Sequence, residues 1–354
     1  MTLTNRELAE LLALESDRHE GNKQKAARRS ARIALAWPLE AADVAEAGEK
    51  LTVLPSVGPW VARLILDWLE KDEEVEIDTD PLRTDFQTFA GAIAQTSEPG
   101  SWRDEVRGDL QMHTTYSDGS LSVAEMAELC IGLDYEYIAI TDHSKGLKIA
   151  GGMDEERLAV QGAEIDAVNV DIANSGRDFR VLKAIEMNLS PDGGGDMEPE
   201  ALAQLDLVLG SFHSQLRKKE DQTNRYMAGV RNPDIHVLGH PRGRQWNFRL
   251  GLIADWGKVF AEAARLDKAV EIDSHPNRQD LNVDLLHLAR EADCRISLGT
   301  DAHYEPELEF IDIGVSAAMK AGIDKERIIN LMPVEELLGW TASLGAGSKT
   351  LRRG

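Results

Sequence analysis

The 354-residue sequence predicts an α/β protein, with a closed barrel of parallel strands preceded by a small all-helical domain. From Trp102 onward, seven short β-branched and apolar runs alternate with amphipathic segments, which is the pattern of repeated strand–helix units. Seven such units favour a closed barrel, because open doubly wound sheets tend to carry fewer units per domain. Before Trp102, apolar residues instead recur at helical spacing.

The N-terminal part predicts three helices and a linker. A Thr/Asn cap opens "LTNRELAELLALES", a run of Lys and Arg lies in "NKQKAARRSARIALAW", and a Pro–Gly turn precedes the apolar helix in "LPSVGPWVARLILDWLEK". An acidic run and a closing Pro-Gly then indicate a linker. We therefore expect a helical domain over 1–72, an acidic linker over 73–102, the barrel over 103–345 and a tail over 346–354.

The strand candidates, in chain order, are "VRGDLQMH", "YEYIAITDH", "FRVLKAIEMNL", "LDLVLGSFH", "DIHVLGHP", "KAVEIDSH" and "CRISLGTDAH". Helices are predicted between most of them, in "LSVAEMAELCIGL", "DEERLAVQGAEIDAVNVDIA", "IADWGKVFAEAARL" and "VDLLHLAREA". In the first of these helices, Ser122 and Glu125 are spaced as a capping box.

Composition narrows the class of protein. The formal net charge of -23 argues against a protein held on nucleic acid by bulk charge, although a local basic patch remains compatible with it. Two cysteines, Cys130 and Cys294, cannot build a disulfide framework or a Cys-based zinc cluster, and their apolar contexts indicate buried thiols in a reducing cytoplasm. We expect no membrane span and no signal peptide, because the apolar runs are too short.

Nearly every strand candidate ends in a side chain that can bind a metal ion. These side chains are His113 with Asp118 beyond it, Asp142 and His143, Glu186, His213, His240, and Asp301 with His303. In a parallel barrel the strand ends meet on one face, which is where barrel enzymes carry their chemistry. Because burying so many ionisable groups without a metal would be costly, the pattern predicts a multinuclear metal site.

The predicted ligands are histidines and carboxylates without cysteine, a set that suits Zn²⁺, Mn²⁺ or Fe²⁺. Two or three such ions held together suit phosphoryl chemistry, since they can generate hydroxide near neutral pH and clamp the attacking and leaving oxygens. His275 ends the sixth strand, but it is interpreted as structural, and Arg278 in the same loop is favoured as a phosphate contact.

Seven segments resemble the PHP (polymerase and histidinol phosphatase) domain, most closely the one at the C-terminus of bacterial family-X DNA polymerases. They are "DLQMHTTYSDGS", "AITDHS", "AIEMN", "GSFHS", "LGHPRGR", "VEIDSHPNRQDL" and "SLGTDAH". The resemblance covers about residues 103–345, with the motifs in order and at the right spacing. It implies a distorted (β/α)7 TIM-like barrel that holds three metal ions.

The resemblance also implies which side chains hold each ion. One ion would be bound by Gln111, His113, Glu186 and Asp301. A second ion would share Glu186 and add His213 and His240, and a third would be bound by Asp118, His143 and His303. Asp142 would orient histidine ligands without binding an ion itself. The residues expected at the reacting centre are His113, Glu186, Asp301 and Asp142.

The N-terminal part resembles the small helical domain that opens those polymerases, with a helix-hairpin-helix in "LPSVGPWVARLI". In that family the hairpin amides hold a DNA phosphate at a helix N-terminus. The candidate DNA contacts are Lys23, Lys25, Arg28, Ser56 and Gly58, where Ser56 replaces the first Gly of the usual motif. The alternative is a hairpin that only docks on the barrel.

Two activities of those polymerases are not expected. Related lyase domains place lysines after the hairpin, where this chain has Trp60 and Leu64, and neither side chain can form an imine. DNA synthesis is not expected either, because the 73–102 segment is too short for a polymerase palm or fingers.

Gln111 stands where the PHP family has the first His of a His-x-His motif. A glutamine offers only its carbonyl oxygen, which is a neutral and weaker ligand for zinc. The other eight positions of the nine-ligand pattern are intact, so we expect an active centre whose first ion is weakly held or hard, such as Mn²⁺ or Mg²⁺. A degenerate site is the alternative.

The leading hypothesis is a metal-dependent phosphoesterase that hydrolyses phosphate esters of DNA ends with metal-activated water, by 3'-5' exonuclease or 3'-end processing activity in DNA repair. Arg242, Arg244 and Arg278 are the candidate phosphate anchors. A second hypothesis is a small-molecule phosphatase for a nucleotide or a compound like histidinol phosphate, which the acidic composition favours. A third is a non-catalytic DNA-binding or scaffold module with a degenerate metal site.

Overall fold

The computed structural model describes residues 3–71 and 79–351, which divide into two compact units. Among the described residues, unit 1 contains 3–71 and 79–101 together with the short segments 244–250 and 276–279. Unit 2 contains residues 102–243, 251–275 and 280–351.

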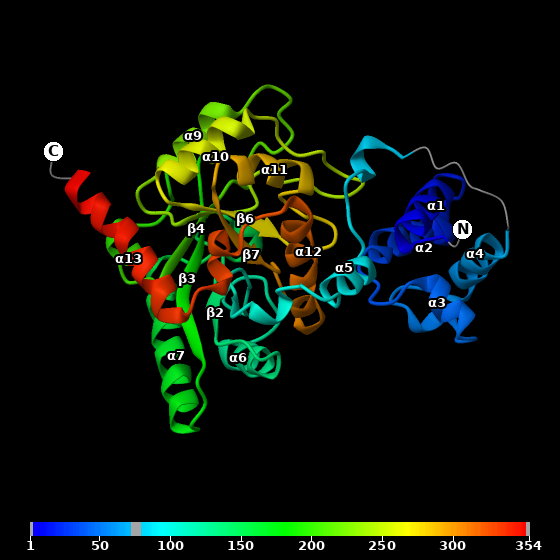
Figure 1. Ribbon diagram of the computed structural model, residues 1–354, viewed down its shortest axis with the longest axis horizontal. Helices are drawn as coiled ribbons and strands as arrows, with labels where there is room; N and C mark the ends of the chain where they lie inside the picture. The colour runs from blue at the N-terminus through cyan, green and yellow to red at the C-terminus, as the bar shows by residue number, and fades with distance from the viewer. Residues whose placement is uncertain (1–2, 72–78, 352–354) are drawn as a thin grey trace. The chain divides into compact units, whose positions relative to one another are not determined.

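Unit 2 is a seven-stranded parallel barrel with helices around it (Figure 1). Each strand pairs with the next strand in the sequence, so the order of strands in the sheet is the same as their order in the chain, from β1 to β7. The strands are β1 (Gly108–Asp109), β2 (Tyr137–Ile140), β3 (Arg180–Asn188), β4 (Leu207–Ser211), β5 (Val237–Leu238), β6 (Ala269–Asp273) and β7 (Arg295–Gly299). Each lies inside a segment predicted as a strand, and the predicted (β/α)7 barrel is confirmed.

Main-chain hydrogen bonds close the barrel between its first and last strands. The Leu110 N–H donates to the Leu298 carbonyl at 3.4 Å, and the Asp301 N–H donates to the Gln111 carbonyl at 3.0 Å. Next to them, the buried Asn330 side chain accepts from the Leu298 N–H at 2.7 Å and donates to the Leu298 carbonyl at 2.8 Å. The seam is therefore held partly by an amide side chain that replaces missing strand pairing.

The barrel strands bury both of their faces, as strands of parallel sheets do. In β2, Ile138 and Ile140 join the apolar layer between strands and helices, whereas Tyr137 and Ala139 join a second apolar cluster. Apolar side chains therefore occupy both faces of β2, and the polar residues of this segment follow the end of the strand.

The barrel helices are α6 (Val123–Gly132), α7 (Glu155–Asn174), α8 (Pro199–Leu202), α9 (Thr223–Arg231), α10 (Trp256–Arg265), α11 (Val283–Glu291), α12 (Ile311–Ala321) and α13 (Val334–Leu351). The predicted capping box of Ser122 and Glu125 is present at the start of α6. Helices α8, α9, α12 and α13 fall outside the predicted helices, and α13 extends into the segment predicted as a tail. Cys130 and Cys294 are buried, free thiols, as predicted.

Unit 1 is built from α1 (Asn5–Asp17), α2 (Gly21–Ala34), α3 (Ala41–Glu46), α4 (Pro59–Leu69) and α5 (Phe89–Thr96). Its core includes the fully buried side chains of Leu8, Leu12, Trp37 and Ile65. Part of the segment predicted as an acidic linker therefore forms α5 and is grouped with unit 1, while residues 72–78 lie outside the described residues.

The turn before α4 carries the segment predicted as a hairpin. Ser56 has a positive φ of 64°, a conformation that glycine adopts more readily, and the Ser30 hydroxyl donates to its carbonyl at 2.7 Å. Gly58 is the N-cap of α4 and provides no side-chain cap. The N-terminal amides of α4 are therefore not capped by a side chain of the N-cap residue.

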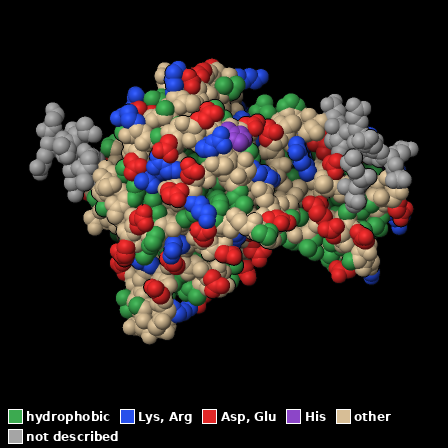
Figure 2. Space-filling model, in the orientation of Figure 1, with side chains coloured by type: hydrophobic (Ala, Val, Ile, Leu, Met, Phe, Trp, Pro, Cys, Tyr) green, Lys and Arg blue, Asp and Glu red, His purple; other side chains and the backbone are tan. Residues whose placement is uncertain are grey.

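The basic side chains of α2 are exposed. They are Lys23, Lys25, Arg28, Arg29 and Arg32, and the Lys23 Nζ lies 5.5 Å from the Trp60 ring centroid. Asp and Glu side chains are spread among the Lys and Arg side chains over the visible face of the molecule, in line with the net charge of -23 (Figure 2). None of the helices in the described part of the chain has the length and apolar character needed to cross a membrane.

Candidate metal centre

The predicted metal ligands are brought together at the carboxyl ends of the barrel strands, all within unit 2. His113 and His143 lie in the loops after β1 and β2, and Glu186 lies near the end of β3. The remaining members follow β4, β5 and β7, and they are His213, His240, Asp301 and His303. Parallel strands with one common direction deliver these distant residues to one face.

Glu186 is the centre of the buried part of the cluster. Its Oε1 lies 3.0 Å from His213 Nε2 and 3.1 Å from His240 Nε2. Its Oε2 lies 2.9 Å from His143 Nδ1 and 3.6 Å from His113 Nε2. One fully buried carboxylate is thus within reach of four imidazoles.

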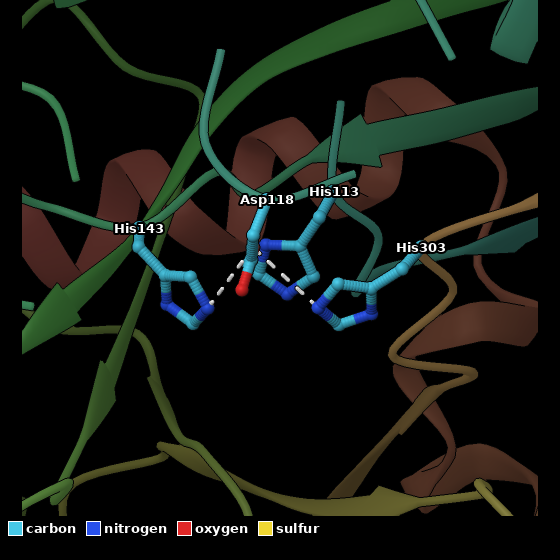
Figure 3. Close-up of side chains that lie close together, drawn as sticks. All are labelled: His113, Asp118, His143 and His303. Carbon is cyan, nitrogen blue, oxygen red and sulfur yellow. Dashed lines mark ion pairs between the residues drawn. The ribbon is translucent and has the colours of Figure 1, made fainter. Parts of the chain in front are cut away.

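Asp118 is the centre of the outer part of the cluster. Its Oδ1 lies 3.5 Å from His143 Nε2 and 3.5 Å from His303 Nε2, and its side chain is 37% exposed. The imidazoles of His113, His143 and His303 surround this carboxylate (Figure 3). The His113 ring stacks against both of the other rings, at centroid distances of 4.4 and 4.5 Å.

Gln111 and Asp301 complete the cluster on the β1 and β7 side. His113 Nε2 lies 3.0 Å from Asp301 Oδ1 and 3.4 Å from Gln111 Nε2. Gln111 is fully buried, and its Oε1 has no hydrogen-bond partner among the described residues. Rotation of the Gln111 amide by half a turn would exchange the positions of its oxygen and nitrogen.

The electrostatics of the buried part favour an ionised Glu186. Burial raises its pKa, but the charges of three neighbouring imidazoles outweigh burial and hold the pKa well below its ordinary value. Burial opposes protonation of His240, but contacts with Glu186 and Glu271 raise its pKa well above the ordinary value. Without metal, His240 therefore favours a bound proton, which a divalent ion would displace.

In the outer part of the cluster, Asp118 and His303 also have pKa values shifted in favour of their charged forms. Burial works against ionisation of Asp118, but the hydrogen bond with His303 and nearby imidazole charges lower its pKa to about 2. Burial also disfavours the charged form of His303, but its hydrogen bond with Asp118 raises the pKa to about 9.

The donor set fits divalent ions. Two groups have ligand atoms that all lie within 4.8 Å of one another, and they are His113, Asp118, His143 and His303, and His143, Glu186 and His213. Both groups combine imidazole nitrogens with carboxylate oxygens, which is the donor set that zinc, manganese and iron accept. Within the described part of the chain, the buried oxygens of Glu186 and the Oε1 of Gln111 make no hydrogen bond of good geometry, which supports the same conclusion. These residues could hold metal ions.

His143 contacts both carboxylates of the cluster. Its Nδ1 lies 2.9 Å from Glu186 Oε2, and its Nε2 lies 3.5 Å from Asp118 Oδ1. His143 therefore connects the two parts of the cluster.

The role predicted for Asp142 is wrong, because its carboxylate contacts no ligand histidine in the hydrogen bonds that the described residues make. It accepts from the Thr114 N–H at 2.8 Å, from the Thr114 and Ser117 hydroxyls, and from Gln161 Nε2 at 2.6 Å. Asp142 thus fixes the loop between His113 and Asp118 instead of an imidazole. The loop lies next to β2 only in the folded barrel, so sequence order did not reveal this contact.

Two contacts of the ligand histidines were not predicted. Glu271 Oε2 lies 2.9 Å from His240 Nδ1, and Asn188 Oδ1 lies 3.2 Å from His213 Nδ1. The one available signal for Glu271 was an acidic residue in the middle of the apolar run "KAVEIDSH".

The three predicted phosphate anchors lie in different settings. Arg242 is half-buried in unit 2 and donates to Asn282 Oδ1 at 3.1 Å. Arg278 is half-buried and belongs to the 276–279 segment of unit 1. Arg244 is buried and belongs to unit 1. Its guanidinium lies 3.8 Å from the Phe86 ring centroid and donates to the carbonyls of Thr84 and Asp85.

His275, interpreted as structural, lies 3.3 Å from Glu307 Oε1. The other oxygen of Glu307 accepts from the His303 N–H at 2.8 Å. His275 therefore contacts a residue that also supports His303, a candidate ligand.

No family model matches the chain. The chain is 37% identical over 234 residues to the DNA polymerase/3'-5' exonuclease PolX of Bacillus subtilis, in a match that covers 66% of this chain and 40% of that protein. It is 28% identical over 238 residues to a probable phosphatase of Acetivibrio thermocellus, over 61% of this chain and 92% of that protein. The predicted relationship to PHP domains is confirmed.

A solved structure of histidinol phosphate phosphatase from Lactococcus lactis, complexed with zinc, L-histidinol and phosphate, matches part of the chain with a TM-score of 0.47 and 16% identity. That match covers 62% of this chain and 95% of the solved chain. The names of the relatives agree with the predicted class, a hydrolase of phosphoester bonds. The chain spans 40% of the length of the Bacillus subtilis relative, and the helix-hairpin-helix of its N-terminal part stays a prediction.

Proposed function

We propose that the chain is a metal-dependent phosphoesterase that hydrolyses phosphate esters at DNA ends. The observation that carries the proposal is the buried Glu186 carboxylate within reach of four imidazoles, joined through His143 to the half-exposed Asp118. Bound divalent ions would supply Lewis acidity and an activated water, which is the chemistry that phosphoester hydrolysis needs.

The side chains of the cluster differ in their exposure to solvent, and their proposed roles differ accordingly. Glu186 is fully buried, whereas the side chains of Asp118 and His303 are 37% and 25% exposed. A phosphate ester therefore approaches from the edge formed by Asp118 and His303, and Glu186 holds the cluster together from below. Arg242, which follows His240 closely in the chain, is the candidate phosphate contact within unit 2.

The choice of DNA as substrate is supported by α2. Five of its basic side chains are exposed on a protein whose net charge is -23, so the helix is a local exception to the acidic surface. Lys and Arg side chains neutralise backbone phosphates without reading sequence, which suits an enzyme acting on ends. The name of the Bacillus subtilis relative includes a 3'-5' exonuclease.

The test is hydrolysis of a 5'-labelled single-stranded oligonucleotide with Mn²⁺. We expect a ladder that shortens from the 3' end and disappears in the His213→Ala variant, because His213 contacts Glu186 at 3.0 Å. A ladder that persists in the variant would point to a contaminating nuclease. The absence of cleavage in the unaltered protein would reject DNA as the substrate.

The second candidate substrate is a small phosphomonoester. It is favoured by the match to the Acetivibrio thermocellus probable phosphatase, because that match covers 92% of the relative. It also suits the strongly acidic composition. Hydrolysis of nucleotides and histidinol phosphate without hydrolysis of oligonucleotides would favour it, and binding of DNA without any turnover would favour a non-catalytic module.

Substitution of α2 separates the two substrates within one enzyme. The variant Lys23→Gln, Lys25→Gln, Arg28→Gln should raise KM for the oligonucleotide and weaken its dependence on salt, while KM for a small phosphomonoester stays unchanged. The matched control removes three exposed lysines from the PHP barrel, Lys258→Gln, Lys320→Gln and Lys325→Gln. An equal loss in both variants would assign the effect to overall charge.

A further inference from the structure

Glu271 is a fully buried carboxylate in the third position of β6 that sequence reasoning did not assign to the site. Its Oε2 accepts from the His240 N–H at 2.6 Å and lies 2.9 Å from His240 Nδ1. The opposite ring nitrogen, Nε2, lies 3.1 Å from Glu186 Oε1. One imidazole is therefore held between two buried carboxylates, with Nε2 facing the cluster.

His213 offers an internal comparison, because its Nε2 lies 3.0 Å from the same oxygen of Glu186. Its outer nitrogen, Nδ1, faces the neutral side chain of Asn188 at 3.2 Å. A carboxylate behind an imidazole fixes the ring tautomer and makes the other nitrogen a stronger ligand than an amide would. The two histidines thus differ mainly in the charge of the group behind them.

The second oxygen of Glu271, Oε1, has no hydrogen-bond partner among the described residues. A Cβ added to Gly299 would lie 2.6 Å from this oxygen and 3.2 Å from Gln111 Cγ, so the two side chains meet above the glycine. The Gln111 Oε1 also lacks a partner there. An amide that turns its oxygen toward a metal ion turns its two N–H donors away from it, toward an acceptor.

We propose that Glu271 is a positioning residue of the metal centre that orients two ligands at once. Through Oε2 it keeps His240 Nε2 facing Glu186, and through Oε1 it accepts an N–H from Gln111 so that the Gln111 oxygen faces the ion. The proposal deepens the proposed function, since it rests on the cluster binding divalent ions. It also gives the neutral Gln111 a defined orientation.

A purely structural role does not account for this arrangement. A fully buried carboxylate destabilises a fold unless its hydrogen bonds compensate, and an apolar residue of similar shape would fill the barrel equally well. Glu271 instead contacts a ligand histidine with one oxygen and leaves the other oxygen beside a second ligand.

The test is the affinity of the full-length protein for Mn²⁺, measured by equilibrium dialysis with Glu271→Gln. We expect the Mn²⁺ affinity of one site to fall by about 10- to 100-fold, because removing a residue that hydrogen-bonds to a metal ligand typically weakens metal binding by this much. The matched control is Glu262→Gln, a nearly buried carboxylate on α10 that pairs with Arg231 and Arg265, and its Mn²⁺ affinity should stay within about twofold of the unaltered protein. An affinity of Glu271→Gln equal to that of the control would overturn the proposal.

A measurement on the unaltered protein remains decisive if Glu271→Gln fails to fold. In the zinc-loaded protein labelled with ¹⁵N-histidine, the His240 resonances should show a protonated Nδ1 and a metal-bound Nε2, with His240→Asn used for assignment. An unprotonated Nδ1 would overturn the proposal. Normal metal binding without hydrolysis of any phosphoester would reject the proposed function alone.

Discussion

The two parts of the metal cluster have the same kinds of donor but differ in burial. Glu186 is fully buried and contacts four imidazoles at 2.9 to 3.6 Å, whereas Asp118 is 37% exposed and contacts two imidazoles at 3.5 Å. A buried carboxylate among imidazoles holds a site together, and a half-exposed one remains open to substrate. The difference indicates that the buried part is needed for metal binding and the outer part for access to substrate.

The largest expected effect compares Glu186→Gln with Asp118→Asn. Loss of the Glu186 charge removes the shared partner of four imidazoles, so hydrolysis should fall by about a thousandfold or more and metal content should fall with it. Asp118→Asn should lower kcat/KM by about 10- to 100-fold and leave most of the bound metal in place. The measurements are phosphoesterase kinetics and metal analysis of the purified variants. Equal metal loss in both variants would break the comparison.

Metal removal should act unevenly on the two parts. A chelator should abolish hydrolysis and lower Tm, because an ion present at about 100 times its Kd stabilises the folded state by about 2.7 kcal/mol. The outer ion should leave before the ion held by Glu186, His213 and His240, since its carboxylate is more exposed and has fewer contacts. Stepwise dialysis with metal analysis and differential scanning calorimetry would measure this. Simultaneous loss of all ions at one chelator concentration would contradict the order.

Packing beneath the buried part should be intolerant of a single added methyl group. A Cβ at Gly299 would lie 2.3 Å from Gln111 Cβ, so Gly299→Ala should destabilise the protein by about 1–3 kcal/mol. Gly132→Ala in α6 is the matched control, because nothing lies within 4 Å of its added Cβ. Urea unfolding followed by circular dichroism measures both variants. Similar stabilities of the two variants would show that the side chains around Gly299 can move to accommodate the added methyl group.

The smallest expected effect is a pH dependence of the metal-free protein. The pKa of His303 is raised from 6.5 to about 9, so its contribution to stability is complete below pH 6.5 and is lost as the pH rises through about 9. The Tm of the chelator-treated protein should therefore decline across that window. His303→Asn should reduce the decline, and His240, whose pKa is also raised, should account for part of the remainder. An unchanged decline in His303→Asn would place the titration elsewhere.

The strand ends carried most of the information about the centre. His113, His213 and His240 each follow a short apolar run, and parallel strands must deliver such residues to one face. The barrel and the candidate ligands could therefore be predicted without any tertiary coordinates. Helix boundaries in the second half of the barrel were less accessible, because α9 and α12 are defined by packing as much as by pattern.

Contacts between strands far apart in the sequence were not accessible to the same reasoning. The sequence placed Asp142 behind a histidine, but it binds Thr114 and Ser117 instead. Arg244 was predicted to bind phosphate, and the structure places its guanidinium against the Phe86 ring inside unit 1. Both residues have the expected chemistry, and only the positions of their neighbours decided its use.

The sequence by itself determined the seven strand–helix units and the donor types at their ends, because periodicity and residue chemistry are local properties. Only the tertiary structure decided that His143 faces both Glu186 and Asp118, and that Glu271 lies behind His240. These contacts depend on the register and tilt of strands that meet only in the closed barrel, and a side chain's partner is set by that geometry.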